Sequence, residues 1–309
     1  MKSIAKTLSL LLVLTLVGRH TYSQTIQTTE NMKNISSKTV VFIHGAFVSS
    51  QCWDEWKDYF EQHGYTVYAP AWPHKDAPAR TLRSRQPDAA IASIRLEQLV
   101  NYYDSLIQRL PEKPILIGHS LGGLIVQLLL QRDRGAAGIA IHSVAPKGTM
   151  TFKLSFLRST SAALGLFTST KKSYLMSFEK WQYAFTNGMT LRQQRDGYER
   201  FAVPESKLAL RDGLSNVAKI DYKKPHAPLL LTSGSIDHAV PASLNRDNFK
   251  KYKKYGEGSI TELKEFEGRN HFVLGQPTWR EDADYILRWI SHHTATTKAA
   301  PLSNATLAR

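Results

Sequence analysis

Residues 114–123 read Pro-Ile-Leu-Ile-Gly-His-Ser-Leu-Gly-Gly, and residues 124–130 continue as Leu-Ile-Val-Gln-Leu-Leu-Leu. An apolar run typical of a strand thus enters a Gly-x-Ser-x-Gly turn and leaves as a run apolar enough for a buried helix. Such a turn forces its serine into a strained backbone conformation, and the flanking glycines let strand and helix pass closely. Ser120 would stand at a helix N-terminus, where free N–H groups favour developing negative charge. The pattern predicts that Ser120 is a nucleophile; the alternative is a purely structural turn.

Strand-like and helix-like runs alternate on both sides of this turn. Strands are expected at residues 39–43, 66–70, 114–117, 138–144, 229–234 and 260–266, and helices at 53–63, 89–110, 124–130 and 277–293. Alternation at this spacing predicts an α/β fold with a doubly wound, mainly parallel sheet. Sites in such sheets lie at the carboxyl ends of the strands.

The alternation stops between Pro146 and Pro225, where no strand of comparable quality occurs. Aromatic and aliphatic residues recur there at roughly helical intervals, so we expect a helical cap insertion at about residues 147–225. Because it leaves the sheet at the carboxyl edge, some of its side chains should line a substrate pocket. The substrate-binding candidates are Phe178, Trp181 and Phe185 from the insertion, and Phe47 and Trp72 from the loops.

The first residues have the pattern of a secretory signal peptide. Residues 1–23 combine two lysines, an apolar run from Leu8 to Val17 and the small residues Thr21 and Ser23 before a cleavage expected after Ser23. The run falls short of the roughly 20 residues of a membrane-spanning helix. We therefore expect a secreted or periplasmic protein without a transmembrane segment in the mature chain. Residues 24–37 are predicted to be a flexible arm, 38–293 the folded domain and 294–309 a disordered tail.

The formal net charge of +14 becomes +11 if the leader, with three basic and no acidic residues, is removed. A basic surface could make peripheral contact with anionic surfaces, but the lysines and arginines are scattered and no nucleic-acid-binding module accompanies them. Cys52 is the only cysteine, so no intrachain disulfide can form. We expect no metal and no other cofactor.

A serine hydroxyl is too weakly acidic to attack alone, so it needs a base and a third group that orients the base. His271 follows the last predicted strand and Asp237 follows the strand at 229–234, which places both at the edge predicted for Ser120. His119 is expected to point away from the nucleophile's face, and the remaining histidines are assigned to surface, turn or core positions. The competing carboxylates are Asp212, Asp221 and Glu265.

The first strand ends in His44-Gly45-Ala46-Phe47. A glycine at the end of a strand permits a tight turn, after which the amide of Ala46 can point into the space above the sheet. Alone, this would be an ordinary strand-to-helix loop. Together with the serine turn, it predicts that the Ala46 amide stabilises an oxyanion.

Residues 38–293 resemble the α/β-hydrolase superfamily, through the His-Gly pair, the Gly-x-Ser-x-Gly-Gly turn and the order Ser120, Asp237, His271. The resemblance implies a capped enzyme with nucleophile Ser120, acid Asp237, base His271 and an oxyanion hole formed by the amides of Ala46 and Leu121. A serine at the turn counts against haloalkane dehalogenases and epoxide hydrolases, whose nucleophile is a carboxylate.

We therefore expect a secreted serine hydrolase that cleaves small-molecule carboxylic esters through an acyl-enzyme intermediate. The cap favours substrates with a hydrophobic acyl or aryl group. Because the superfamily hosts many activities on one frame, a thioesterase, a lactonase, a perhydrolase and a hydroxynitrile lyase remain alternatives. A non-catalytic ligand-binding protein is the least favoured.

Overall fold

The computed structural model describes residues 35–149, 151 and 153–294. The predicted signal peptide (1–23), most of the predicted arm (24–37) and nearly all of the predicted tail (294–309) lie outside the described residues.

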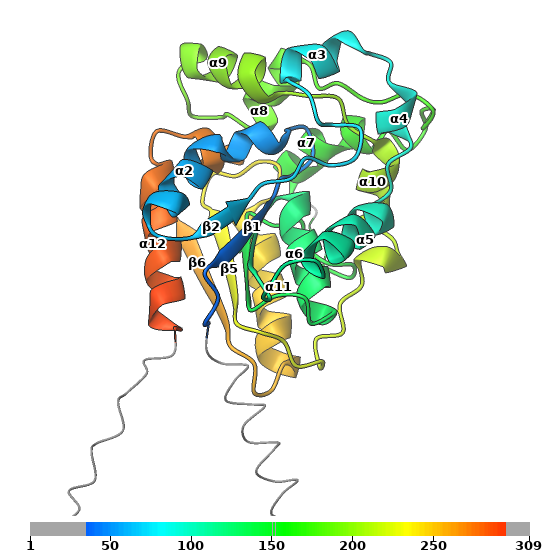
Figure 1. Ribbon diagram of the computed structural model, residues 1–309. Helices are drawn as coiled ribbons and strands as arrows, with labels where there is room; N and C mark the ends of the chain where they lie inside the picture. Colours follow the sequence, from blue (N-terminus) through cyan, green and yellow to red (C-terminus); the bar gives the residue numbers. More distant parts are fainter. Residues whose placement is uncertain (1–34, 150, 152, 295–309) are drawn as a thin grey trace, which may run out of the picture.

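A parallel sheet forms the centre of the molecule (Figure 1). Its strands are β1 (Thr39–Ile43), β2 (Thr66–Tyr68), β3 (Ile115–His119), β4 (Ala137–Ile141), β5 (Leu229–Gly234) and β6 (Thr261–Phe266). They lie in the order β2-β1-β3-β4-β5-β6, and every neighbouring pair is parallel. The predicted α/β fold with a mainly parallel sheet is confirmed.

Helices cover both faces of the sheet, with α2 (Asp54–Gln62) and α12 (Trp279–His292) on one face and α5 (Leu96–Ile107), α6 (Leu121–Gln131) and α11 (Ala242–Tyr255) on the other (Figure 1). Strands β1, β3, β4 and β5 are buried along their whole length, as their continuous apolar runs require. On the α2 side, Phe42 of β1 stacks on Trp53 with 4.5 Å between ring centroids and meets the rings of Trp56 and Phe60 edge-on. This aromatic cluster fixes α2 to the sheet.

The segment between β4 and β5 contains α7 (Leu154–Leu164), α8 (Phe178–Ala184), α9 (Leu191–Phe201) and α10 (Lys207–Asp212). Among the described residues it adds no strand to the sheet; its strand-like pairing is one antiparallel bridge between Tyr174 and Glu205. Figure 1 shows α8 and α9, together with α3 (Ala79–Ser84), beyond the carboxyl ends of the strands. This segment therefore lies at the edge of the sheet where a site is expected.

The predicted helix at 89–110 is interrupted, giving α4 (Ala89–Ala92) and α5. At the break, the Ser206 hydroxyl donates to the carbonyls of Ala92 and Ile94, and the Asp212 carboxylate accepts from the Leu96 amide. These polar groups come from the far segment and replace intrahelical partners, so the local periodicity could not reveal the break.

None of the helices in the described part of the chain combines the length and the apolar character needed to cross a bilayer.

Candidate active site

Ser120 lies on the tight turn between β3 and α6, with backbone angles φ 56° and ψ −117°. These angles are strained for a residue with a side chain. The turn closes only because glycines flank it: a Cβ on Gly118 would meet the Gly122 carbonyl, and one on Gly122 would meet the Ile43 carbonyl. The Ser120 amide donates to the Ile141 carbonyl at 2.9 Å, which ties the turn to β4.

Ala46 and Leu121 follow adjacent strands at the point where the sheet changes its winding direction. The chain leaves β1 toward α2 on one face and leaves β3 toward α6 on the other (Figure 1). Leu121 is the first residue of α6, where an amide has no intrahelical partner. Neither this amide nor that of Ala46 has a hydrogen-bond partner within residues 35–149, 151 and 153–294, so both are free to donate to a bound group.

Ser120, His271 and Asp237 form a continuous chain of hydrogen bonds. The Ser120 Oγ lies 3.0 Å from His271 Nε2, and His271 Nδ1 lies 2.8 Å from Asp237 Oδ2. Because the carboxylate can only accept, Nδ1 carries the proton and Nε2 is left to accept from the serine. The other carboxylate oxygen, Oδ1, accepts the Val240 amide at 2.7 Å.

The competing carboxylates lie elsewhere. Asp212 pairs with Arg95, Glu265 pairs with Arg246, and Asp221 accepts the amide of Lys223.

A second histidine, which was predicted to be a surface, turn or core residue, contacts the same carboxylate. His142 Nδ1 lies 3.0 Å from Asp237 Oδ2, and its side chain is completely buried. A Cβ on Gly234 would strike the His142 ring, so that glycine makes room for it. His142 directly follows β4 just as Asp237 and His271 follow the ends of β5 and β6. The predicted strand at 138–144 extended past His142, so its place after the end of β4 was missed.

Two imidazoles and one backbone amide surround the Asp237 carboxylate. Burial alone would raise its pKa, but the charge and hydrogen bonds of His271 and His142 outweigh burial and hold the pKa well below its usual range. The carboxylate therefore stays ionised at neutral pH. An ionised acceptor beside His271 stabilises positive charge on that ring.

Ligand atoms of His142, Asp237 and His271 lie within 4.8 Å of one another, a spacing that a metal ion could use. Both Nδ1 atoms are, however, within hydrogen-bond distance of the single oxygen Asp237 Oδ2. Two N–H donors converging on one carboxylate oxygen account for the cluster.

Among the substrate-binding candidates, Phe185 lies nearest to the hydrogen-bonded chain. Its ring meets the His271 ring edge-on at 4.8 Å, and the Phe47 ring meets Phe185 edge-on at 6.1 Å. Trp181 stacks on Phe185 from behind at 4.5 Å and is fully buried. These three rings form an apolar wall beside His271.

The other two candidates have different neighbours. Trp72 stacks on His44 at 4.5 Å, and its amide donates to His44 Nε2 at 3.2 Å. Phe178 meets Tyr198 of α9 edge-on at 5.5 Å. Trp72 thus packs against the end of β1 that precedes Ala46, whereas Phe178 packs within the segment between β4 and β5.

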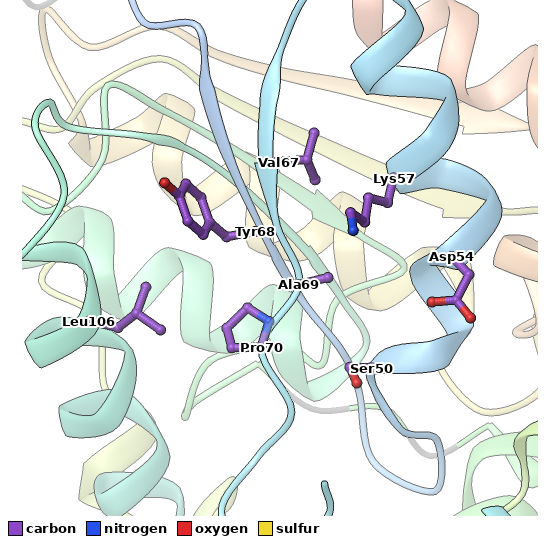
Figure 2. Close-up of a pocket in the computed structure, with 8 residues that line it drawn as sticks. All are labelled: Ser50, Asp54, Lys57, Val67, Tyr68, Ala69, Pro70 and Leu106. Carbon is purple, nitrogen blue, oxygen red and sulfur yellow. The ribbon is translucent and has the colours of Figure 1, made fainter. Parts of the chain in front are cut away.

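A separate pocket of about 360 Å³ lies on the outer side of the sheet edge (Figure 2). Its lining comes from α2 and the turn before it, from β2 and the residues that follow it, and from α5: Ser50, Asp54, Lys57, Val67, Tyr68, Ala69, Pro70 and Leu106. None of them belongs to the hydrogen-bonded chain or to the substrate-binding candidates. This pocket is therefore separate from the hydrogen-bonded residues Ser120, His271 and Asp237.

A family model described as the alpha/beta hydrolase family matches residues 40–283. No curated protein sequence matches the chain. Solved structures with the same fold include a monoacylglycerol lipase from Paleococcus ferrophilus, at 22% identity and a TM-score of 0.60, over 84% of this chain and 97% of the other.

Two further similar structures have comparable scores. An extracellular alpha/beta-hydrolase from a Paenibacillus species is 20% identical with a TM-score of 0.57, over 81% of this chain and 98% of the other. A pyrethroid hydrolase from Sphingobium faniae is 20% identical with a TM-score of 0.56, over 82% and 97%. At these identities the likeness concerns the fold.

Two buried histidines make the stability of the site sensitive to acid. Burial, together with the charge of His271, lowers the pKa of His119 well below its usual value, and burial together with Lys75 does the same for His44. In the unfolded chain both imidazoles have a pKa of about 6.5. Their stabilising contribution is therefore complete above that pH and is lost as the pH falls, by about 1.4 kcal/mol per pH unit per histidine.

We expect His119→Gln to reduce the slope of the free energy of unfolding against pH, because one titrating group is removed. The glutamine amide can still donate to the His271 carbonyl, which His119 Nε2 contacts at 2.8 Å. Urea unfolding between pH 7 and 5 would measure the slope of the free energy of unfolding. The exposed His292→Gln is the control and should keep the wild-type slope. An unchanged slope in His119→Gln would contradict a neutral, buried His119.

Proposed function

Because the chain belongs to the α/β-hydrolase family, we propose that it is a serine hydrolase that cleaves carboxylic esters through Ser120, His271 and Asp237. The observation that carries this proposal is the continuous hydrogen-bond chain of 3.0 and 2.8 Å from the serine hydroxyl to a buried carboxylate. Serine, imidazole and carboxylate in this order supply a nucleophile, a base and a group that orients the base.

In the first half of the reaction, Ser120 Oγ attacks the ester carbonyl carbon and its proton moves to His271 Nε2. The carbonyl oxygen becomes an oxyanion, which the free amides of Ala46 and Leu121 stabilise. The intermediate collapses as His271 returns the proton to the departing alkoxide, leaving an acyl group on Ser120 and a free alcohol. Asp237 keeps the imidazole in its tautomer and stabilises its positive charge.

In the second half, water replaces the alcohol. His271 Nε2 takes a proton from the water as its oxygen attacks the acyl carbon, and the second oxyanion uses the same two amides. Collapse releases the carboxylic acid and returns the proton to Ser120 Oγ.

The rings beside His271 support an apolar acyl or aryl group in the substrate. Phe185 contacts the His271 ring, and Phe47 and Trp181 pack on Phe185. Apolar surfaces of this kind bind substrates through buried apolar area. The similar structures described as a monoacylglycerol lipase and a pyrethroid hydrolase support hydrolysis as the reaction class. We further propose export through a signal peptide at residues 1–23, which N-terminal sequencing of the mature protein tests.

Ser120→Ala should lower the turnover of p-nitrophenyl esters by roughly 10⁶ while the fold is kept, because the nucleophile is lost. A fluorophosphonate should label Ser120 in the wild type, as peptide mass spectrometry would show. The control is Ser233→Ala, a buried serine at the carboxyl end of β5 whose hydroxyl has no hydrogen-bond partner among the described residues. A Ser120→Ala variant that keeps several per cent of wild-type activity would refute the assignment.

His142→Phe should lower kcat/KM about tenfold at nearly constant KM, because one charge-assisted hydrogen bond to Asp237 is lost. His142→Asn should keep most of the activity: asparagine retains a donor and tolerates the positive φ of 46° at this position. Steady-state kinetics of the two folded variants would measure this difference. Equal activity of both variants would mean that the His142 hydrogen bond does not position Asp237.

Over a series of p-nitrophenyl esters from acetate upward, kcat/KM should rise with chain length. Each methylene buried against the apolar wall should lower the free energy of the transition state by up to about 0.8 kcal/mol, until the chain extends beyond the wall. Phe185→Ala should flatten this rise more than Phe178→Ala, because the Phe185 ring lies against His271. Tyr255→Ala, an exposed position at the end of α11, is the control. A flat profile in the wild type would remove the apolar wall from the substrate site.

A further inference from the structure

A buried ion pair lies directly behind the loop that carries Ala46. Lys75 Nζ is 2.8 Å from Glu205 Oε2, and both side chains are 0% exposed. Lys75 belongs to the excursion after β2, and Glu205 lies between α9 and α10. A buried pair of this kind is weak evidence for stability, since the cost of removing both charges from water can exceed their attraction. Its neighbours must therefore explain what it does.

The neighbour that matters is Phe47. Glu205 Oε2 accepts the Phe47 amide at 3.0 Å, and the Val203 amide donates to the Phe47 carbonyl at 2.9 Å. Residues of the cap thus hold both polar backbone groups of Phe47. With φ at 66°, Phe47 is in the left-handed region, which is unfavourable for a residue with a side chain. The two hydrogen bonds from the cap hold the loop in this conformation.

Phe47 directly follows Ala46, whose amide is one of the two free donors near Ser120. The peptide unit that joins Ala46 to Phe47 is planar, so fixing the Phe47 amide also fixes the carbonyl end of Ala46. Only the two backbone torsions of Ala46 remain between this fixed unit and the amide that would meet an oxyanion. Donors of this kind are effective only when they are oriented before the reaction.

The ammonium group of Lys75 acts electrostatically. The Glu205 carboxylate accepts the amide of Phe47, the residue next to Ala46, and if it were unpaired its negative charge would oppose an oxyanion at the Ala46 amide. Lys75 neutralises the carboxylate. The same ammonium lies 4.7 Å from the centroid of Trp72, the ring that stacks on His44.

We propose that Glu205 and Lys75 are positioning residues of the active site: Glu205 holds the loop that orients the Ala46 amide, and Lys75 cancels the charge of Glu205 beside the developing oxyanion. This inference rests on the proposed function. It assigns a catalytic consequence to a contact between the cap and the body of the molecule.

Glu205→Gln keeps the size of the side chain but turns one terminal oxygen into an NH₂ group. Because the two carboxylate oxygens accept the amides of Phe47 and Ser206, one of these amides must lose its acceptor. We expect kcat for a p-nitrophenyl ester to fall by about 10- to 100-fold at nearly unchanged KM. The affinity of a trifluoromethyl ketone, which adds to Ser120 and forms an oxyanion, should fall by a similar factor.

Lys75→Met should reduce kcat more than Glu205→Gln, since it leaves an unpaired carboxylate next to the oxyanion. The double variant Lys75→Met/Glu205→Gln should recover part of that loss, because it removes both charges together.

The matched control is Asp212→Asn. Asp212 also joins the cap to the body through a buried carboxylate, which pairs with Arg95 at 2.7 Å and accepts the Leu96 amide at 3.1 Å. Among the described residues, none of the hydrogen bonds or ion pairs of Asp212 reaches the loop at Ala46. Both Glu205→Gln and Asp212→Asn should lower the melting temperature, but only Glu205→Gln should lower kcat and the affinity for the ketone.

A folded Glu205→Gln variant with wild-type kcat and ketone affinity would overturn the proposal, as would an equal loss of kcat in Asp212→Asn. If Glu205→Gln does not fold, the double variant decides by the same two measurements. If the wild type cleaves no ester, the proposed function fails instead. The positioning role is then read from the rate at which a fluorophosphonate labels Ser120, because that step also places charge on an oxygen in the oxyanion hole.

Discussion

The close approach of the β3–α6 turn to the end of β1 is the constraint on which the rest of the site depends. Backbone meets backbone there, since a Cβ on Gly122 would collide with the Ile43 carbonyl and one on Gly45 with the His119 carbonyl. The contact brings the Ser120 hydroxyl beside the loop at Ala46 and close to two amides, those of Ala46 and Leu121, that have no hydrogen-bond partner in the described part of the chain. The same parallel sheet then delivers three buried side chains, His142, Asp237 and His271, from the ends of β4, β5 and β6.

The sequence predicted those parts of the fold that local patterns encode. Continuous apolar runs marked the strands because burial on both faces requires them. Helix α11 was not predicted because polar residues fill part of its buried face: Asn245 donates to the Ser143 carbonyl and Asn248 to the Gln127 side chain. The break between α4 and α5 was missed for a related reason, since its hydrogen-bond partners lie more than 100 residues away in the chain.

The candidate site shows the same division between local and distant information. Ser120, Asp237 and His271 each follow a strong strand or turn signal, and the structure brings them within hydrogen-bond distance. The role of His142 depends on a carboxylate 95 residues away, and that of Glu205 on an amide 158 residues away. No window of sequence contains both partners of such a contact, so composition and periodicity could not assign them.

Three residues of this site, Phe47, Ser120 and His142, have positive φ angles of 66°, 56° and 46°. At about 1 kcal/mol each, their conformations would together cost about 3 kcal/mol of a total stability that is typically about 5–15 kcal/mol. Glycine would adopt these angles without steric cost, but at position 47 it would also remove a buried ring, and the loss of a buried phenylalanine side chain costs about 3–5 kcal/mol. The packing of this ring therefore outweighs the cost of its torsion angle, and the strained loop is stable without a glycine at that position.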